Sequence, residues 1–194
     1  MGDQRLSWRL SANRAIEYAE RNGLGTGGLV PNDTYFTAQW HLRNTGQGNG
    51  TPGAHIRATD AWDVTTGSPS TTIAVLDTGI DTDHIEFIGR IDPNGYDFVN
   101  QDPDPEADHP HGTEVSGTMC ANANNNFGVT GVDWQCKVMP IKVLDQNNNG
   151  TIMDLAQGLN YCASQAHVQV ISMSLINYPS SVTLTNALQA ARNA

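Results

Sequence analysis

An aspartate and a histidine have the types and the setting of residues that could do chemistry together. Asp77 ends the apolar run "TIAVLD" (72–77), and His111 opens "HGTEVSGT" (111–118), in which small residues recur at helical spacing. A carboxylate that accepts a hydrogen bond from one imidazole nitrogen fixes the tautomer of the ring, and the other nitrogen can then take a proton from a nucleophile. Taken singly, each residue also has a structural interpretation, Asp77 as a turn residue and His111 as a helix cap.

Three apolar runs predict the strands that must position these groups. They are "TIAVLD", "KVMPIKVLD" (137–145) and "VQVISMSL" (168–175), each continuous enough for a strand that is buried on both faces. Pro140 predicts an irregular or edge position for the second strand, because proline cannot donate to a ladder. Functional groups collect at the carboxyl ends of such strands, where Asp77 lies.

Helices are expected between and after these strands. Residues 151–166 place apolar side chains on one helical face, and Thr151 with Asp154 predicts a capping box at the start. A further helix is expected at about 182–193, and a short one within 58–67. The alternation of strand and helix predicts a mainly parallel sheet with helices on both faces, a three-layer α/β/α fold.

Length and charge limit the class of protein. A chain of 194 residues with a formal net charge of −10 has no excess of Lys and Arg for nucleic acid or an anionic membrane surface. No apolar run approaches the roughly 18 residues of a membrane span, and the N-terminus has no apolar core of a signal peptide. A short helix at 11–22 and a glycine-rich joint at 23–33 place the start of the compact domain near Pro31. Cys120, Cys136 and Cys162 are compatible with one bridge and a free thiol or with three buried thiols.

The motifs around Asp77 and His111 resemble those of the subtilisin-like serine proteases, the subtilases or peptidase family S8. "AVLDTGID" (74–81) is similar to the aspartate motif of that family, and "HGTEVSGT" to its histidine motif, which opens a buried helix. The resemblance extends over nearly all of residues 31–194. It implies a subtilisin-like fold, a secreted serine endopeptidase that acts on polypeptides, His111 as general base and Asp77 as its orienting carboxylate. Residues 1–30 are then a flexible extension or the remnant of a propeptide.

One part of the family pattern has no counterpart in the sequence. The family nucleophile lies in a Gly-Thr-Ser motif that opens a later helix, and no such string occurs among the 194 residues. Ser116 and Ser174 are expected inside a helix and a strand, which does not suit a nucleophile. The chain is therefore expected to be the N-terminal part of a protease domain, without the nucleophile and the oxyanion asparagine, and inactive alone.

The resemblance also implies a substrate-binding edge. The family pairs a Ser-Leu-Gly strand with the extended substrate by β-augmentation, and this chain has Ser174, Leu175 and Ile176 there. The opposite wall corresponds to Asn148, Asn149 and Gly150, which are otherwise interpreted as a polar loop.

Two calcium sites are expected. Five carboxylates crowd the loop 96–111, where they repel one another unless a hard cation or solvent separates them. Similarity to thermitase-like members implies that the ligands in this loop are Asp97, Asp102, Asp104 and Glu106; a solvated acidic loop is the alternative. The same resemblance implies a second site from three separated pieces of chain, which supply Asp33, Glu86 and Asn125.

Two other functions remain open from the sequence. "HPH" (109–111) with Asp108 and Asp77 could hold a transition metal in a hydrolase, although such a motif normally ends a strand and here opens a helix. A calcium-stabilised module without catalytic activity, a pseudoprotease or binding module, is the other alternative.

Overall fold

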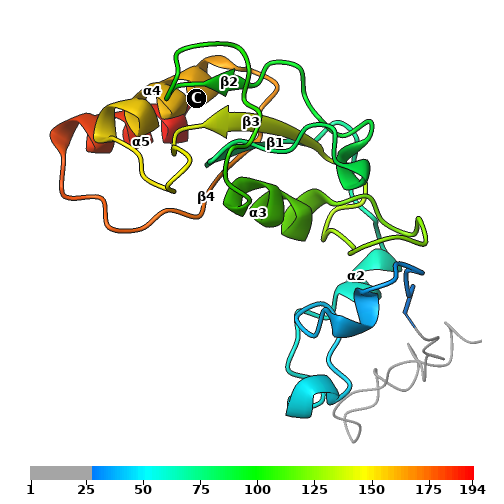
Figure 1. The fold of residues 1–194 in the computed structure, drawn as a ribbon. Coiled ribbons are helices and arrows are strands. Elements are labelled where there is room, and N and C mark those ends of the chain that lie inside the picture. The colour runs from blue at the N-terminus through cyan, green and yellow to red at the C-terminus, as the bar shows by residue number, and fades with distance from the viewer. Residues whose placement is uncertain (1–27) are drawn as a thin grey trace, which may run out of the picture.

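The computed structural model describes residues 28–194, so the helix expected at 11–22 and residues 23–27 of the glycine-rich joint lie outside the described residues (Figure 1). Four parallel strands form one sheet in the order β2-β3-β1-β4. Their bounds are β1 Thr72–Asp77, β2 Tyr96–Asp97, β3 Lys137–Lys142 and β4 Val170–Met173. The short β2 had no strand signal in the sequence, because two residues are too few to show a period.

Strand β1 lies between β3 and β4, and its side chains alternate between two cores. Ala74 and Leu76 face one hydrophobic cluster, whereas Val75 faces the other. All of these side chains are buried, which accounts for the continuous apolar run in the sequence. Asp77 stands at the carboxyl end of this central strand, level with Lys142 at the end of β3.

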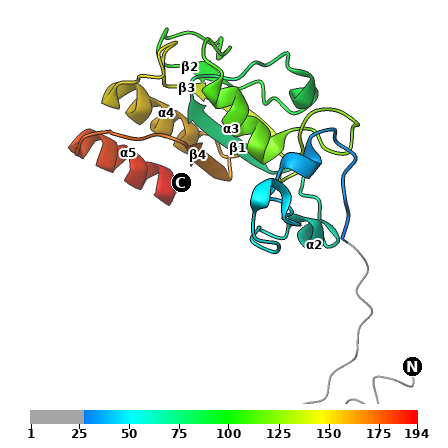
Figure 2. The same cartoon turned by 60° about the horizontal axis from the view of Figure 1, so that its bottom comes forward.

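Helices cover both faces of the sheet (Figure 2). Helix α3 (His111–Cys120) packs on one face through Val115 and Met119. Helices α4 (Ile152–Ser164) and α5 (Val182–Asn193) cover the other face. Thr151 and Asp154 form the predicted capping box at the start of α4. The predicted three-layer α/β/α architecture with a parallel sheet is confirmed.

The sequence predicted an irregular or an edge position for Pro140, and the structure places it at an irregular position inside the sheet. Strand β3 pairs with β1 on one side and with β2 on the other. Val138, two residues before Pro140, donates its backbone N–H to the Arg90 carbonyl on the β2 side (2.9 Å). Alternate residues face the same side, so the missing N–H of Pro140 faces the interruption between Ile91 and β2.

Strand β4 is shorter and more exposed than its apolar sequence indicates. It ends at Met173, and it is the outer strand of the sheet within residues 28–194. Val170 and Met173 are therefore 47% and 39% exposed, and the expectation of burial on both faces was wrong for this strand.

The segment before β1 forms a small core of its own against the loop that precedes β3. Phe36, Leu42, Ala58 and Trp62 are buried there, and Trp134 packs against them. The short elements of this region and the next loop are η1 Phe36–Ala38, η2 Gln47–Asn49, α2 Ala58–Trp62 and η3 Ile85–Phe87. None of the helices described in residues 28–194 is long and apolar enough to span a membrane.

Candidate active site

The structure brings Asp77 and His111 together at the carboxyl end of β1. Nδ1 of His111 lies 2.7 Å from Oδ1 of Asp77. The Asp77 side chain is 1% exposed and the His111 ring 32%, so the carboxylate is shielded while the ring reaches solvent. The backbone N–H of Thr78 also donates to Oδ1 of Asp77 (2.8 Å). Because Nδ1 is engaged by the carboxylate, Nε2 is the ring nitrogen left for a reacting group.

The hydroxyl of Thr78 ties the start of α3 to the end of β1. It donates to the carbonyl of His109 (2.9 Å) and accepts from the backbone N–H of Gly112 (2.9 Å). These bonds hold the residues on both sides of His111 against the strand end. The fit also excludes a side chain at Gly112, where an added Cβ would lie 2.1 Å from the carbonyl oxygen of Gly79.

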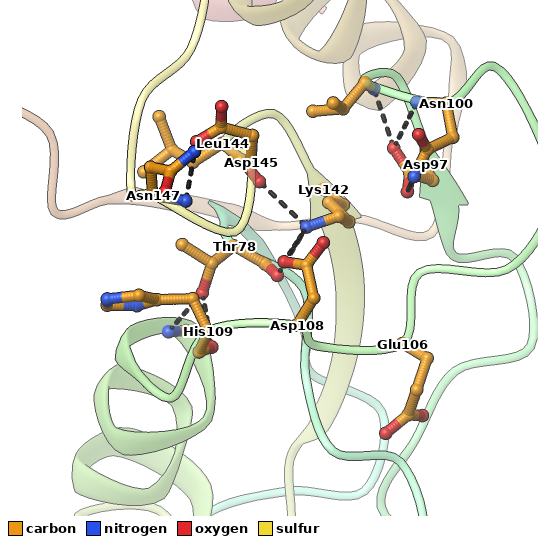
Figure 3. A network of polar contacts seen from close by, with 12 residues as sticks. Thr78, Asp97, Asn100, Glu106, Asp108, His109, Lys142, Leu144, Asp145 and Asn147 are labelled. Atoms are coloured by element: carbon orange, nitrogen blue, oxygen red, sulfur yellow. Dashed lines mark hydrogen bonds and ion pairs between the residues drawn. The ribbon is translucent and has the colours of Figure 1, made fainter.

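A buried lysine supports the same junction (Figure 3). The Lys142 side chain is 1% exposed, and its ammonium donates to Oδ1 of Asp108 at 2.6 Å. It also donates to the carbonyls of Thr78 (3.1 Å) and Leu144 (2.9 Å). All three donors of the ammonium are thus used, which is what a buried charge requires. The lysine joins the ends of β1 and β3 to the residue three positions before His111.

Sequence reasoning missed Thr78 and Lys142 as parts of the site. A signal for Lys142 was present, because a lysine between Ile141 and Val143 in a buried strand must find an anionic or carbonyl partner. Which partner it finds cannot be seen locally, because Asp108 is 34 positions away in the chain.

The other candidate groups near the dyad are already engaged or lie elsewhere. Nδ1 of His109 accepts from the backbone N–H of His111 (3.2 Å), so this ring nitrogen caps the helix. Ser116 is buried inside α3 as expected. Ser174 follows the end of β4, so the prediction that it lies inside a strand was wrong.

The six residues predicted for substrate binding line one open pocket of about 400 Å³. Asn148, Asn149 and Gly150 form one wall, and Ser174, Leu175 and Ile176 the other. An added Cβ at Gly150 would lie 2.2 Å from the Val143 carbonyl, so the loop is packed closely onto the residue that follows β3. Ile176 is 81% exposed, so its side chain does not fill this pocket.

Asp33, Glu86 and Asn125, predicted as one calcium site, also come together. Asp33 and Glu86 are 5% and 2% exposed, and Asn125 Nδ2 donates to Oε2 of Glu86 (3.0 Å). Oδ1 of Asp33 is buried without a hydrogen-bond partner among the described residues. Burial raises the pKa of Glu86, and the nearby charge of Asp33 adds to the rise. Two buried carboxylates whose hydrogen bonds within residues 28–194 come from neutral donors leave their charge uncompensated.

The acidic loop does not gather its side chains in this way. Oδ1 of Asp97 accepts from the backbone of Val99 and Asn100, and its Oδ2 from the Asn100 amide (2.9 Å). Glu106 points away and accepts from Thr82 (Figure 3). Asp102 and Asp104 each accept a backbone N–H two residues further on. Within residues 28–194, no three His, Cys, Asp or Glu side chains cluster in a way that could hold a metal ion.

A family model and two known proteins match this chain, and the three matches agree with one another. A family model described as the subtilase family matches residues 68–194. A thermophilic serine proteinase of Bacillus sp. (strain AK1) is 38% identical over 186 residues, which are 95% of this chain and 43% of that protein. Thermitase of Thermoactinomyces vulgaris is 34% identical over 146 residues, 75% of this chain and 48% of that protein. The chain thus spans less than half the length of these relatives.

A solved structure has the same fold. The structure of a protease from Pseudoalteromonas arctica PAMC 21717 superposes with a TM-score of 0.70 at 31% identity. The match covers 85% of this chain and 56% of that chain.

Proposed function

The chain belongs to the subtilase family, and from that premise we propose that it supplies the aspartate and the histidine of a serine endopeptidase. The observation that carries this proposal is the 2.7 Å contact between Asp77 Oδ1 and His111 Nδ1 at the carboxyl end of the central strand. A buried carboxylate and a solvent-facing imidazole in this relation are the two groups that activate a serine hydroxyl.

In the proposed mechanism, His111 is the general base and Asp77 orients it. The Asp77 carboxylate accepts a hydrogen bond from the N–H at Nδ1, which leaves the lone pair of Nε2 free to take the proton of the attacking hydroxyl. As the ring becomes an imidazolium, the shielded carboxylate stabilises its charge. The same ring then returns the proton to the leaving amine.

We infer that the serine nucleophile and the oxyanion donor come from outside these 194 residues. No Gly-Thr-Ser string occurs in the sequence, and Ser116 is buried within a helix. We infer that the 194-residue chain alone does not hydrolyse peptides, and that the dyad acts with a serine from a further part of the protein.

The proposed substrates are polypeptides, bound in the pocket between Gly150 and Leu175. Residues 174–176 follow the outer strand of the sheet, where an extended peptide can add its backbone as a further strand. We also propose that the enzyme acts outside the cell, as its resemblance to secreted subtilases implies.

We propose that Asp33, Glu86 and Asn125 hold a structural calcium ion. The orphaned Oδ1 of Asp33 and the uncompensated charge of Glu86 support this site, because Ca²⁺ prefers carboxylate and amide oxygens. An ion bound there would supply positive charge that these buried carboxylates lack, and it would tie residue 33 to the loop that contains Asn125. The proposal does not extend to the acidic loop, where the oxygens of Asp97 already accept protein donors.

The test compares the 194-residue chain with a longer protein that includes a Gly-Thr-Ser segment of the same gene. We expect no turnover of casein or a chromogenic peptide by the chain alone, and turnover by the longer protein that is lost in His111→Ala. Turnover by the pure chain, or a longer protein that retains full activity in His111→Ala, would refute the proposal.

A further inference from the structure

Two of the three cysteines face each other behind the helix that carries His111. Cys120 is the last residue of α3, and Cys136 directly precedes β3. Both are fully buried, and their Sγ atoms lie 2.7 Å apart. Even carbon atoms in good contact are about 3.5–4.0 Å apart, so the two larger sulfurs are much closer than packing alone requires. The third cysteine, Cys162, lies in α4 on the opposite face of the sheet.

The backbone holds the two cysteines in this relation without help from the sulfurs. The N–H of Asp133 donates to the carbonyl of Met119 (2.9 Å), one residue before Cys120. The N–H of Cys136 donates to Oδ1 of the same Asp133 (2.7 Å). The end of α3 and the start of β3 are therefore already joined at residue 133, and the facing sulfurs follow from that junction.

The surroundings of the pair make the two sulfurs unequal in the folded chain. Nη2 of Arg90 lies 3.5 Å from Sγ of Cys136. The hydrogen bond with Cys120 lowers the pKa of Cys136, and the Arg90 charge acts in the same direction, whereas burial and the Asp133 charge oppose this change. The same hydrogen bond, together with burial, raises the pKa of Cys120. One sulfur is thus the better nucleophile and the other its partner.

We propose that Cys120 and Cys136 form a disulfide when the protein folds in an oxidising compartment, and that Cys162 stays a free thiol. The oxidant is a small disulfide such as oxidised glutathione. The thiolate of either cysteine attacks it and releases one thiol, and the sulfur of the other cysteine then displaces a second thiol from the mixed disulfide. Two cysteine thiols lose two electrons and two protons, and the small disulfide takes them up as two thiols. Because both sulfurs are fully buried in the folded chain, the exchange takes place before α3 closes on β3.

The bridge closes the loop of residues 120–136. That loop contains Asn125 and Val129, which both donate hydrogen bonds to Glu86. The bridge also fixes the C-terminal end of the helix whose first residue is His111. Its effect on stability comes mainly from restricting the unfolded chain, and a loop of this size predicts a melting temperature raised by about 6–12 °C.

The first experiment maps the sulfurs directly. The protein is folded with oxidised and reduced glutathione, denatured without reductant, alkylated with iodoacetamide and cleaved before aspartates. Cleavage before Asp133 separates peptide 108–132, with Cys120, from peptide 133–144, with Cys136, while Cys162 lies in 154–194. We expect the first two peptides to appear as one linked species that reductant separates, and Cys162 to be alkylated.

The second experiment measures the consequence. Reductant is expected to lower the melting temperature of the wild type and of Cys162→Ser by about 6–12 °C, and to leave a Cys120→Ser/Cys136→Ser variant unchanged. Alkylation of all three cysteines in wild-type protein that was folded with glutathione and then denatured would overturn the proposal. A linked peptide that contains Cys162 would also overturn it. The mapping uses wild-type protein, so it stands even where a serine variant does not fold.

Discussion

The contact of Lys142 with Asp108 predicts that the junction below the dyad depends on one buried charge pair. The perturbation is Asp108→Asn, which keeps the size of the side chain and removes its charge. The buried ammonium then keeps the carbonyls of Thr78 and Leu144 but loses its counter-charge. The variant is expected to destabilise the contact between the end of β3 and the segment that leads into His111.

The magnitude follows from the exposure of the two partners. Breaking a fully buried pair costs about 3–5 kcal/mol, because one charge is left uncompensated, whereas exposed pairs contribute about 0–1 kcal/mol. The Lys142 side chain is 1% exposed and that of Asp108 is 44% exposed, so the expected loss lies between these limits. We expect Asp108→Asn to lower the free energy of unfolding by about 2–3 kcal/mol.

The assay is urea unfolding followed by tryptophan fluorescence. Asp104→Asn is the matched control, since this carboxylate lies in the same loop and accepts a single backbone N–H from Glu106 (3.3 Å). Its expected effect is below about 0.5 kcal/mol. A Lys142→Met background completes a double-mutant cycle, in which Asp108→Asn should lose most of its effect because the buried ammonium is gone.

Two results would refute this reasoning. One is a loss for Asp108→Asn no larger than that for Asp104→Asn, which would mean that the buried ammonium does not need the carboxylate. The other is an equal effect of Asp108→Asn in the Lys142→Met background, which would mean that the cost arises elsewhere in the loop.

Three further predictions concern single residues. Gly112→Ala should lower the free energy of unfolding in urea by about 2–4 kcal/mol, because its Cβ would meet the Gly79 carbonyl at 2.1 Å. Gly117→Ala has open space at its Cβ, so it should be neutral or stabilising by up to about 1 kcal/mol. Because the pKa of Glu86 is raised, the calcium-free protein should have stability at acid pH that is lost as pH rises through that pKa. Glu86→Gln should remove this loss. The same variant should also remove the calcium-dependent rise in melting temperature that EDTA reverses. Asp77→Asn should lower kcat of the serine-containing protein about 10⁴-fold at unchanged fold, measured with a chromogenic peptide, since the amide favours the wrong imidazole tautomer.

Local signals in the sequence predicted the elements that hold the dyad. The run 72–77 coincides with β1 because a strand buried on both faces needs no alternation of polar residues. Thr151 and Asp154 predicted the start of α4 because a capping box is a contact between residues three positions apart. The position of Asp77 at a strand end followed from the end of the apolar run at residue 77.

What the sequence did not predict depends on distant contacts. The ammonium of Lys142 finds Asp108, and the Thr78 hydroxyl finds His109, across more than thirty residues. The acidic loop is a different case: Asp97 stays a predicted metal ligand, and within the described residues its hydrogen bonds come from a turn of its own loop. Charge density in a sequence does not reveal whether carboxylates face one another or their own backbone.

The supports of the dyad have a consequence for the order in which the protein is made. Strand β1, helix α3 and strand β3, which carry the dyad and Lys142, all lie within residues 72–142. The last residue that Lys142 contacts is Leu144. A chain synthesised from its N-terminus therefore contains the proton-accepting pair and the Thr78 and Lys142 contacts that brace it before any residue of β4 or α5 exists. On the proposed function, the growing polypeptide holds a base with nothing to activate, and cleavage of neighbouring proteins has to wait until a later-made segment brings the hydroxyl.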